Sequence, residues 1–498
     1  MNVNPITRLD YPDPDVIRVE DTYYMVSTTM HFMPGCEILQ SFDLVHWEHV
    51  TYVYETLDHT DAQQLKSGQN IYGQGMWAAS LRYHEGRFYI CFVANDTRKT
   101  YLYTSEKIDG PWKKQLIEGF YHDGSLLFDE DGRNYIVYGN DEIWITELNE
   151  DLTAPKKDGL HRLLVSDHKN PELGYEGSHI QKINGYYYIF LVHSLRDRWM
   201  RTEACFYSDS LEGEFTGGDV LCDDRGYCGQ GVAQGGIVDT PDGKWYAMLF
   251  QDSGAVGRIP ILLPVTWKDH FPFFGQNGHV PEEIEVHSTR PGYIYQPLVG
   301  SDDFCNGLLP RWQFNHDPDP RYYHLDALQG TYTITTREVC TELTQAVNTL
   351  TQRMSYPSCA AEVTVDASAL KEGDVAGLCA LQSCYAAVGI TKHHGKYEVL
   401  MLDKKEDGIL DMTEGTVVES HQMDFRLEAD FCNMKDEARC YYRVNKGDWL
   451  PIGTVHKLYF KLDHFTGCRF GLFCYAAEKT GGSACFRDFK YYDVDEIS

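Results

Sequence analysis

The most regular feature of the chain is a short motif in which an acidic residue or asparagine, usually followed by glycine, precedes aromatic residues and an apolar run. It occurs five times, at residues 21–26, 85–90, 131–136, 184–189 and 242–247. Four of the five copies carry Asn-Gly, Asp-Gly or Glu-Gly, and such pairs suit a two-residue turn with positive φ. The motif therefore predicts five hairpins, each joining two adjacent antiparallel strands.

The spacing of these turns indicates a repeat architecture. Successive turns are 64, 46, 53 and 58 residues apart, which leaves room for four short strands and their loops in each repeat. Helical periodicity is scarce in this stretch. Because four-stranded sheets repeated around an axis form a propeller, we predict an all-β protein with a five-bladed β-propeller over residues 1–290.

The residue eight positions before each turn is unusual in composition. Equal offsets imply equivalent places on one strand of each blade, and the innermost strand of a blade lines the propeller axis. Four of the five positions are polar or charged, where a purely structural strand would prefer Val or Ile. The sequence therefore predicts a polar ring around the axis, formed by Asp13, Trp77, Asp123, Glu176 and Gln234.

A second domain follows the repeat. The blade pattern stops after Trp267, and the Pro/Gly-rich segment 287–303 is typical of a linker. Beyond it, short alternating strands predict a β-sandwich over residues 300–498, at 332–335, 361–365, 386–390, 397–401 and 458–462. Two domains are also what a chain of 498 residues leads us to expect.

Charge and cysteine content limit the classes of partner and the cellular location that we expect. The formal net charge of −30 disfavours nucleic acid and anionic lipid surfaces as partners and suits a neutral substrate. No apolar run approaches a membrane span, and the N-terminus lacks the pattern of a signal peptide. The 15 cysteines include no CxxC pair, so we expect free thiols and a cytoplasmic protein.

Carboxylates that converge on one axis are suited to glycoside hydrolysis. This reaction needs an acid for the leaving oxygen and a second carboxylate across the sugar, which inverts the configuration if it activates water and retains it if it attacks directly. Neighbouring acids also raise one another's pKa, so that one can stay protonated near neutral pH. The alternative is a solvated polar channel, or a metal or sugar site without catalysis.

Several motifs resemble glycoside hydrolase family 43, and together they cover the whole first domain. They are Tyr11-Pro12-Asp13-Pro14-Asp15, Met76-Trp77-Ala78, Asp123-Gly124-Ser125-Leu126, Glu176-Gly177-Ser178-His179, Gln234-Gly235-Gly236 and Pro264-Val265-Thr266-Trp267. The C-terminal stretch, from Leu298-Val299-Gly300-Ser301-Asp302-Asp303-Phe304 through Phe486-Arg487-Asp488-Phe489, resembles the concanavalin-like sandwich appended to the family's β-xylosidases and arabinofuranosidases.

The resemblance implies an inverting mechanism and a role for each residue of the site. It implies that Asp13 is the general base, Glu176 the general acid and Asp123 the residue that tunes the pKa of the acid. It further implies that Arg258 contacts the sugar and that Trp77 forms an aromatic wall of the pocket.

Two further positions follow from the same resemblance. Met30 lies where the family often places a bulky apolar residue. Gln234 replaces a histidine that helps to hold a metal ion in many members, so we expect no metal in the active site and no required cofactor. In the second domain, Asp302, Asp303 and Asp488 are candidate ligands of a structural calcium ion, because hard cations prefer oxygen.

The leading hypothesis is an exo-acting β-xylosidase or α-L-arabinofuranosidase on short xylan-derived oligosaccharides. An arabinanase or galactan-type glycosidase on the same propeller is the second hypothesis. The third is a sugar-binding propeller without turnover, which three intact carboxylates disfavour. The sequence leaves open whether the chain forms a homo-oligomer.

Overall fold

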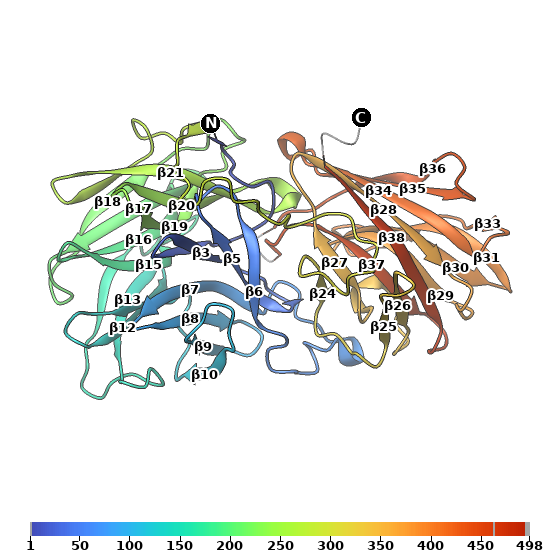
Figure 1. Cartoon of the computed structure of the whole chain (residues 1–498), viewed down its shortest axis with the longest axis horizontal. Coiled ribbons are helices and arrows are strands. Elements are labelled where there is room, and N and C mark those ends of the chain that lie inside the picture. Colours follow the sequence, from blue (N-terminus) through green and yellow to red (C-terminus); the bar gives the residue numbers. More distant parts are fainter. Residues whose placement is uncertain (1, 462–463, 494–498) are drawn as a thin grey trace.

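The computed structural model describes residues 2–461 and 464–493, and it forms two β-domains side by side (Figure 1). Within these residues the only helices are four short 3₁₀ helices, η1 (Lys66–Gly68), η2 (Gly254–Val256), η3 (Leu343–Gln345) and η4 (Cys432–Met434). No described helix is long and apolar enough to cross a membrane. The prediction of an all-β propeller followed by a sandwich is confirmed.

The propeller consists of five four-stranded antiparallel sheets. The first two blades are β2 (Asp15–Val19), β3 (Thr22–Val26), β5 (Gly35–Ser41) and β6 (Glu48–Tyr54), then β7 (Met76–His84), β8 (Arg87–Ala94), β9 (Lys99–Ser105) and β10 (Lys113–Ile117). The third and fourth are β11 (Ser125–Phe128), β12 (Asn134–Asn140), β13 (Glu142–Leu148) and β14 (His161–Ser166), then β15 (Glu176–Ile183), β16 (Tyr186–Ser194), β17 (Arg201–Ser208) and β18 (Thr216–Leu221). The fifth is β19 (Ala233–Asp239), β20 (Trp245–Asp252), β21 (Arg258–Lys268) and β22 (Phe271–Phe274), while β1 (Asn2–Val3) pairs with β23 (Glu283–Ile284).

The first strand of each blade lies at the centre of the propeller. Strands β2, β7, β11, β15 and β19 contact one another in sequence order, and β19 contacts β2, so the ring closes. All five predicted hairpins connect the first strand of a blade to its second. Apolar clusters fill the spaces between neighbouring blades. These clusters hold the blades at fixed places around the axis, because burial of apolar surface stabilises each contact.

The sandwich consists of two large sheets with one apolar core between them. The nine-stranded sheet contains β4 (Phe32–Met33), β24 (Gln313–Asn315), β27 (Leu350–Arg353), β29 (Asp374–Leu381), β30 (Tyr385–His393), β31 (Lys396–Lys404), β32 (Leu410–Met412), β33 (Thr416–Val418) and β37 (Arg469–Ala476). The seven-stranded sheet contains β25 (Tyr323–Asp326), β26 (Thr331–Thr335), β28 (Ser358–Asp366), β34 (Gln422–Asp430), β35 (Glu437–Val444), β36 (Leu450–Lys457) and β38 (Ser483–Asp493).

One strand predicted for the sandwich is wrong. Four of the five predicted strands lie within β26, β28, β30 and β31. Residues 458–460, in contrast, lie outside any strand, Lys461 forms only an isolated bridge, and Leu462 lies outside the described residues. Leu458 and Tyr459 are nevertheless buried, so tertiary contacts and not sheet pairing shield these two side chains from solvent.

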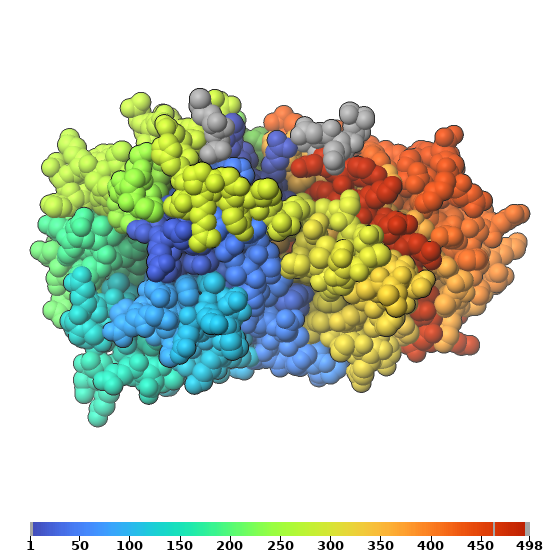
Figure 2. Space-filling view, in the orientation of Figure 1, coloured from blue at the N-terminus to red at the C-terminus, as the bar shows by residue number. Residues whose placement is uncertain are grey.

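The two domains are joined by more than the linker. Strand β4, which is inserted in the first blade, pairs with β24 of the sandwich. Arg353 of the sandwich reaches Glu37 of the first blade at 2.9 Å, with both side chains buried. The linker runs over the surface from propeller to sandwich (Figure 2), and Thr289 donates a backbone hydrogen bond to Phe42. These contacts allow the sandwich to contribute to a site on the propeller.

Candidate active site

The structure brings the five residues of the predicted ring together around one cavity of about 180 Å³. Asp13 and Asp123 each lie two residues before the first strand of a blade, and Glu176 is the first residue of β15. Trp77 and Gln234 are the second residues of β7 and β19. The constant offset from the turn therefore corresponds to one opening of the propeller channel, where the innermost strands begin.

The backbone at this opening is strained where the side chains turn inward. Asp13, Asp123 and Gln234 have φ values of 51°, 48° and 63°, in the left-handed region that non-glycine residues rarely adopt. Such conformations cluster at functional sites, because the surrounding fold must hold them in place. Gly177, with φ 67°, lies so close to Gln234 that a Cβ atom would come within 2.7 Å of the glutamine side chain.

Asp13 is held by two donors on opposite sides. Arg258 Nη1 donates to Oδ1 at 2.7 Å, and Thr28 Oγ1 donates to Oδ2 at 2.5 Å. The carboxylate is 4% exposed. The contacts fix the orientation of the carboxylate and leave its remaining lone pairs available to a water molecule in the cavity.

A second buried layer holds the arginine that contacts Asp13. Asp252 accepts a hydrogen bond from Arg258 Nε at 3.2 Å and pairs through its other oxygen with Arg201. Burial and the nearby Arg258 charge lower the pKa of Arg201 to about 9. Asp252 is therefore the counter-ion that allows two guanidinium groups to lie together beneath the acids.

Asp123 and Glu176 both approach the same nitrogen of one imidazole. Nε2 of His122 is 3.5 Å from Asp123 Oδ2 and 3.5 Å from Glu176 Oε2. Gly177 N donates to Asp123 Oδ2 at 3.1 Å, and Asn140 Nδ2 donates to Glu176 Oε2 at 2.7 Å. The two carboxylates and the imidazole thus form one coupled proton-binding group.

The pKa values of this group are displaced in opposite directions. Burial, with the charges of Glu176 and Asp13, raises the pKa of Asp123 to about 6. Burial also acts to raise the pKa of Glu176, but the contact with His122 outweighs it and the net shift is downward. Burial opposes the charged imidazole, yet Asp123 and Glu176 raise the pKa of His122 to about 9. Perturbed groups of this kind mark functional sites.

The wall of the cavity includes a side chain from the other domain. Phe465, in the sandwich, lies with its ring centroid 5.1 Å from that of Trp77, and the Arg258 guanidinium lies 3.9 Å from the Phe465 centroid. Leu173 and Trp199 complete the apolar part of the lining. An apolar wall opposite acids suits a sugar ring, which has apolar faces and polar edges.

The sequence model of the glycosyl hydrolases family 43 matches residues 3–272, more than half of the chain. The chain belongs to glycosyl hydrolase family 43. A second match, to the β-xylosidase C-terminal concanavalin A-like domain, covers residues 301–492. The protein is accordingly a family 43 glycosidase with a concanavalin-like sandwich.

Relatives agree with this assignment. A β-xylosidase of Formosa agariphila is 26% identical over 99% of this chain and 89% of its own, and a xylosidase/arabinosidase of Butyrivibrio fibrisolvens is 24% identical over 99% of both chains. A solved bifunctional GH43-CE protein of Bacteroides eggerthii is 41% identical with a TM-score of 0.91. All of this chain is covered in that comparison, but only 64% of the longer protein.

Five residues of this family 43 site were missed in the sequence: His122, Leu173, Trp199, Arg201 and Phe465. His122 could have been found, because it directly precedes a residue of the predicted ring. Trp199, an aromatic residue among charged neighbours, carried a weaker signal. Phe465 carried none, because its place at the site depends on how the two domains pack.

Two other predicted positions do not line the cavity. Met30 is fully buried and is not among the lining residues, and its backbone pairs with Met76. Asp302 uses both oxygens within the sandwich, accepting from Phe304 N and Trp312 Nε1 at 2.8 Å each. It lines a shallow cavity with Asp303 and Asp488, and a calcium ion there stays a prediction.

The described residues bring together one group of metal-type donors, and it lies in the active site. Ligand atoms of His122, Asp123 and Glu176 lie within 4.8 Å of one another. The imidazole nitrogen Nε2 lies 3.5 Å from each carboxylate, so the same three groups are also placed to exchange protons.

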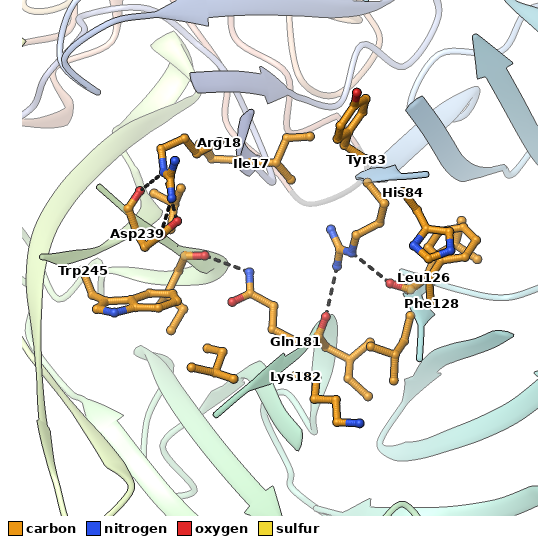
Figure 3. A pocket seen from close by; sticks show the side chains of 17 residues that line it. Ile17, Arg18, Tyr83, His84, Leu126, Phe128, Gln181, Lys182, Asp239 and Trp245 are labelled. Atoms are coloured by element: carbon orange, nitrogen blue, oxygen red, sulfur yellow. Dashed lines mark hydrogen bonds and ion pairs between the residues drawn. The ribbon is translucent and has the colours of Figure 1, made fainter. Parts of the chain in front are cut away.

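The opposite opening of the channel contains a larger cavity of about 410 Å³, lined by later residues of the same five strands (Figure 3). Arg82 donates there to the carbonyls of Leu126 and Ile180 and to Ser125 Oγ, and it pairs with Asp15 at 2.8 Å. The other Asp15 oxygen lies 3.1 Å from His179 Nδ1. The guanidinium of Arg82 thus connects four blades at the axis of the enzyme.

Proposed function

We propose that the chain is an inverting, exo-acting glycosidase that releases xylose or arabinose from short xylan-derived oligosaccharides. The main support for this proposal is the size and lining of the active-site cavity. Its volume of about 180 Å³ is below the 300–1,000 Å³ typical of pockets for larger ligands, and it is walled by residues of both domains. Such a cavity suits a single terminal sugar and disfavours an arabinanase, whose chain substrate requires an open groove.

In the proposed mechanism, the terminal sugar stacks against Trp77 between the acids. Glu176 donates a proton to the glycosidic oxygen as its bond to the sugar breaks. Asp13, held by Arg258, removes a proton from the attacking water. Asp123 stays near Glu176 and tunes its pKa, because each negative charge disfavours the other. Water attacks the face opposite the leaving group, so the configuration inverts.

The choice of sugar is supported by the relatives. Those reported above are named β-xylosidase and xylosidase/arabinosidase. A solved GH43 hydrolase engineered to display endo-xylanase and exo-arabinofuranosidase activity is 27% identical with a TM-score of 0.88, and each chain is covered to 99%. Xylose and arabinose are both five-carbon sugars, and we propose that the chain accepts one or both.

We further propose a reducing, cytoplasmic location and catalysis that requires neither metal nor cofactor. Fifteen free cysteines among the described residues suit a compartment in which thiols stay reduced. The buried guanidinium groups of Arg201 and Arg258 supply positive charge beside the acids. Activity that is unchanged after dialysis against a chelator is the expected result.

The deciding experiment has two parts. Wild type and Glu176→Ala are assayed on aryl β-xyloside and aryl α-L-arabinofuranoside, and activity that survives the substitution would refute the assignment of the acid. The anomeric configuration of the first product is then followed by NMR. Appearance of the inverted anomer is expected, and the retained anomer would refute the inverting mechanism.

A further inference from the structure

We propose that His122 is a positioning residue for the catalytic proton: its imidazole shares one proton with the carboxyl group of Glu176 and returns a proton to that group after each turnover. This inference rests on the proposed role of Glu176 as the acid. In this proposal His122 transfers a proton, whereas charge compensation alone would require only that its imidazole be positively charged.

The geometry places the imidazole for this exchange. Nε2 of His122 lies 3.5 Å from Glu176 Oε2, within reach of a short side-chain movement, and it makes no hydrogen bond to any described residue. The backbone is anchored, because the carbonyl of His122 accepts a hydrogen bond from Gly139 N at 3.1 Å. The ring lies edge-on to Trp77, with centroids 6.3 Å apart, so it borders the same cavity as the sugar.

The surrounding charges favour a proton on this group. The carboxylates that act on His122 are those of Asp123, Glu176 and Asp13, and Asp252 in β20 adds a fourth carboxylate to the site beside Arg258. The facing cations are Arg201 in β17 and Arg258 in β21, and Asp252 pairs with both. Four carboxylates thus face two guanidinium groups, and a proton held between His122 and Glu176 reduces that excess of negative charge.

The displaced pKa values agree with a shared proton. The pKa of His122 is raised to about 9 and that of Glu176 is lowered, so the proton resides mainly on the imidazole. A carboxylate cannot protonate a leaving group, so a glycosidase of this kind needs a route that moves the proton to Glu176. Transfer from Nε2 to Oε2 creates the neutral imidazole and the carboxylic acid that catalysis requires.

The proton balance of one turnover is then complete. The imidazolium of His122 first passes its Nε2 proton to the Glu176 carboxylate and becomes neutral. The acid form of Glu176 then gives that proton to the leaving oxygen, and the attacking water gives one of its protons to Asp13. Asp13 releases a proton to solvent and His122 takes one up, so the net reaction consumes one water molecule.

The pH dependence distinguishes this role from a purely electrostatic one. If His122 shares the proton, the pair stays singly protonated up to about pH 9 and the activity persists to that pH. Loss of the imidazole then moves the basic limb of kcat/KM to lower pH. If the imidazolium acts only through its charge, its removal raises the pKa of Glu176 and moves the basic limb to higher pH.

The experiment measures kcat/KM from pH 5 to 10 for wild type, His122→Gln and His122→Phe. On a substrate with a poor leaving group, we expect both variants to differ from wild type. The basic limb of their kcat/KM profile should move to lower pH by about one unit or more, and their kcat/KM at pH 8.5 should fall about tenfold or more. On a dinitrophenyl glycoside, which needs little acid assistance, we expect a loss of about threefold or less. His84→Gln, at the other opening of the channel, is the matched control.

A second measurement requires no substrate. NMR titration of His122 is expected to give a pKa near 9 in the wild type and a value at least about one unit lower in Glu176→Gln. An ordinary titration near 6.5 in the wild type, or a basic limb that stays or rises in His122→Gln, would overturn the inference. Failure of the wild type to hydrolyse any glycoside would refute the proposed function instead, and the titration would still report on the shared proton.

Discussion

The two openings of the propeller channel are built from the same five strands, yet they differ in how their charges are compensated. At the wider opening, Arg82 and Asp15 form a buried pair supported by backbone carbonyls and His179. Burial acts to raise the pKa of Asp15, but Arg82 and His179 outweigh it and lower that pKa. At the narrower opening, burial and neighbouring acids raise the pKa of Asp123 instead. The comparison teaches that incomplete compensation of charge, and not the size of a cavity, marks the site of chemistry.

The first prediction, which has the largest expected effect, compares the activities of one variant at each opening. Glu176→Gln at the narrow opening removes the proton donor, and we expect kcat/KM on a substrate with a poor leaving group to fall about 10²–10⁴-fold. Asp239→Asn at the wide opening changes a carboxylate paired with Arg18 and should leave kcat/KM within about twofold. Comparable losses in both variants would show that the openings do not differ in function.

The second prediction separates them by stability. Arg82→Met leaves Asp15 buried without its main cation, and we expect the free energy of unfolding to fall by about 3–5 kcal/mol. Urea denaturation monitored by tryptophan fluorescence measures it. The double variant Arg82→Met/Asp15→Asn should recover part of the loss, because the uncompensated charge is gone. A loss below about 1 kcal/mol would contradict the role of Arg82 at the axis.

The third prediction concerns the acid that is poorly compensated. The folded pKa of Asp123, about 6, lies above its ordinary value of 3.8, so its contribution to stability is present at low pH and is lost as pH rises through 6. The stability advantage of Asp123→Asn over wild type should therefore grow, by on the order of 1–2 kcal/mol, as the pH rises from 4.5 to 8. Thermal unfolding at both pH values measures the gain, and a pH-independent difference would refute it.

The fourth prediction concerns Phe465, the side chain that the sandwich domain contributes to the wall of the active-site cavity. Phe465→Ala removes the ring that contacts Trp77 and Arg258, and we expect kcat/KM to fall about tenfold, mainly through KM. Phe273→Ala, at a half-exposed position of the propeller, is the matched control. Equal kinetics in the two variants would exclude a contribution of the sandwich to the pocket.

The smallest effect is expected at the rim of the wide opening. Arg18 pairs with Asp239 in a partly exposed position, where solvent screens the charges. Arg18→Gln should change the free energy of unfolding by about 0–1 kcal/mol and leave activity unchanged. If Arg18→Gln lowered the free energy of unfolding as much as Arg82→Met in the same denaturation experiment, burial would not determine how much these ion pairs contribute to stability.

Much of the site could be predicted because it depends on local regularity. Each hairpin turn fixes where the first strand of its blade ends, and strands of similar length place the residue eight positions earlier at the same opening. Asp13, Asp123 and Glu176 therefore came together from positions more than 160 residues apart. Residues outside that register, such as Arg201 at the start of β17, followed no repeat and were missed.

The sequence by itself determined the five repeats, the all-β class and the ring of polar residues, because turn chemistry and strand periodicity act over a few residues. Only the tertiary structure decided which charges are compensated. Arg82 reaches four blades, His122 lies between two carboxylates, and Phe465 crosses from one domain to the other. Burial and distance set the strength of each of these contacts, and both arise only when segments far apart in the chain pack together.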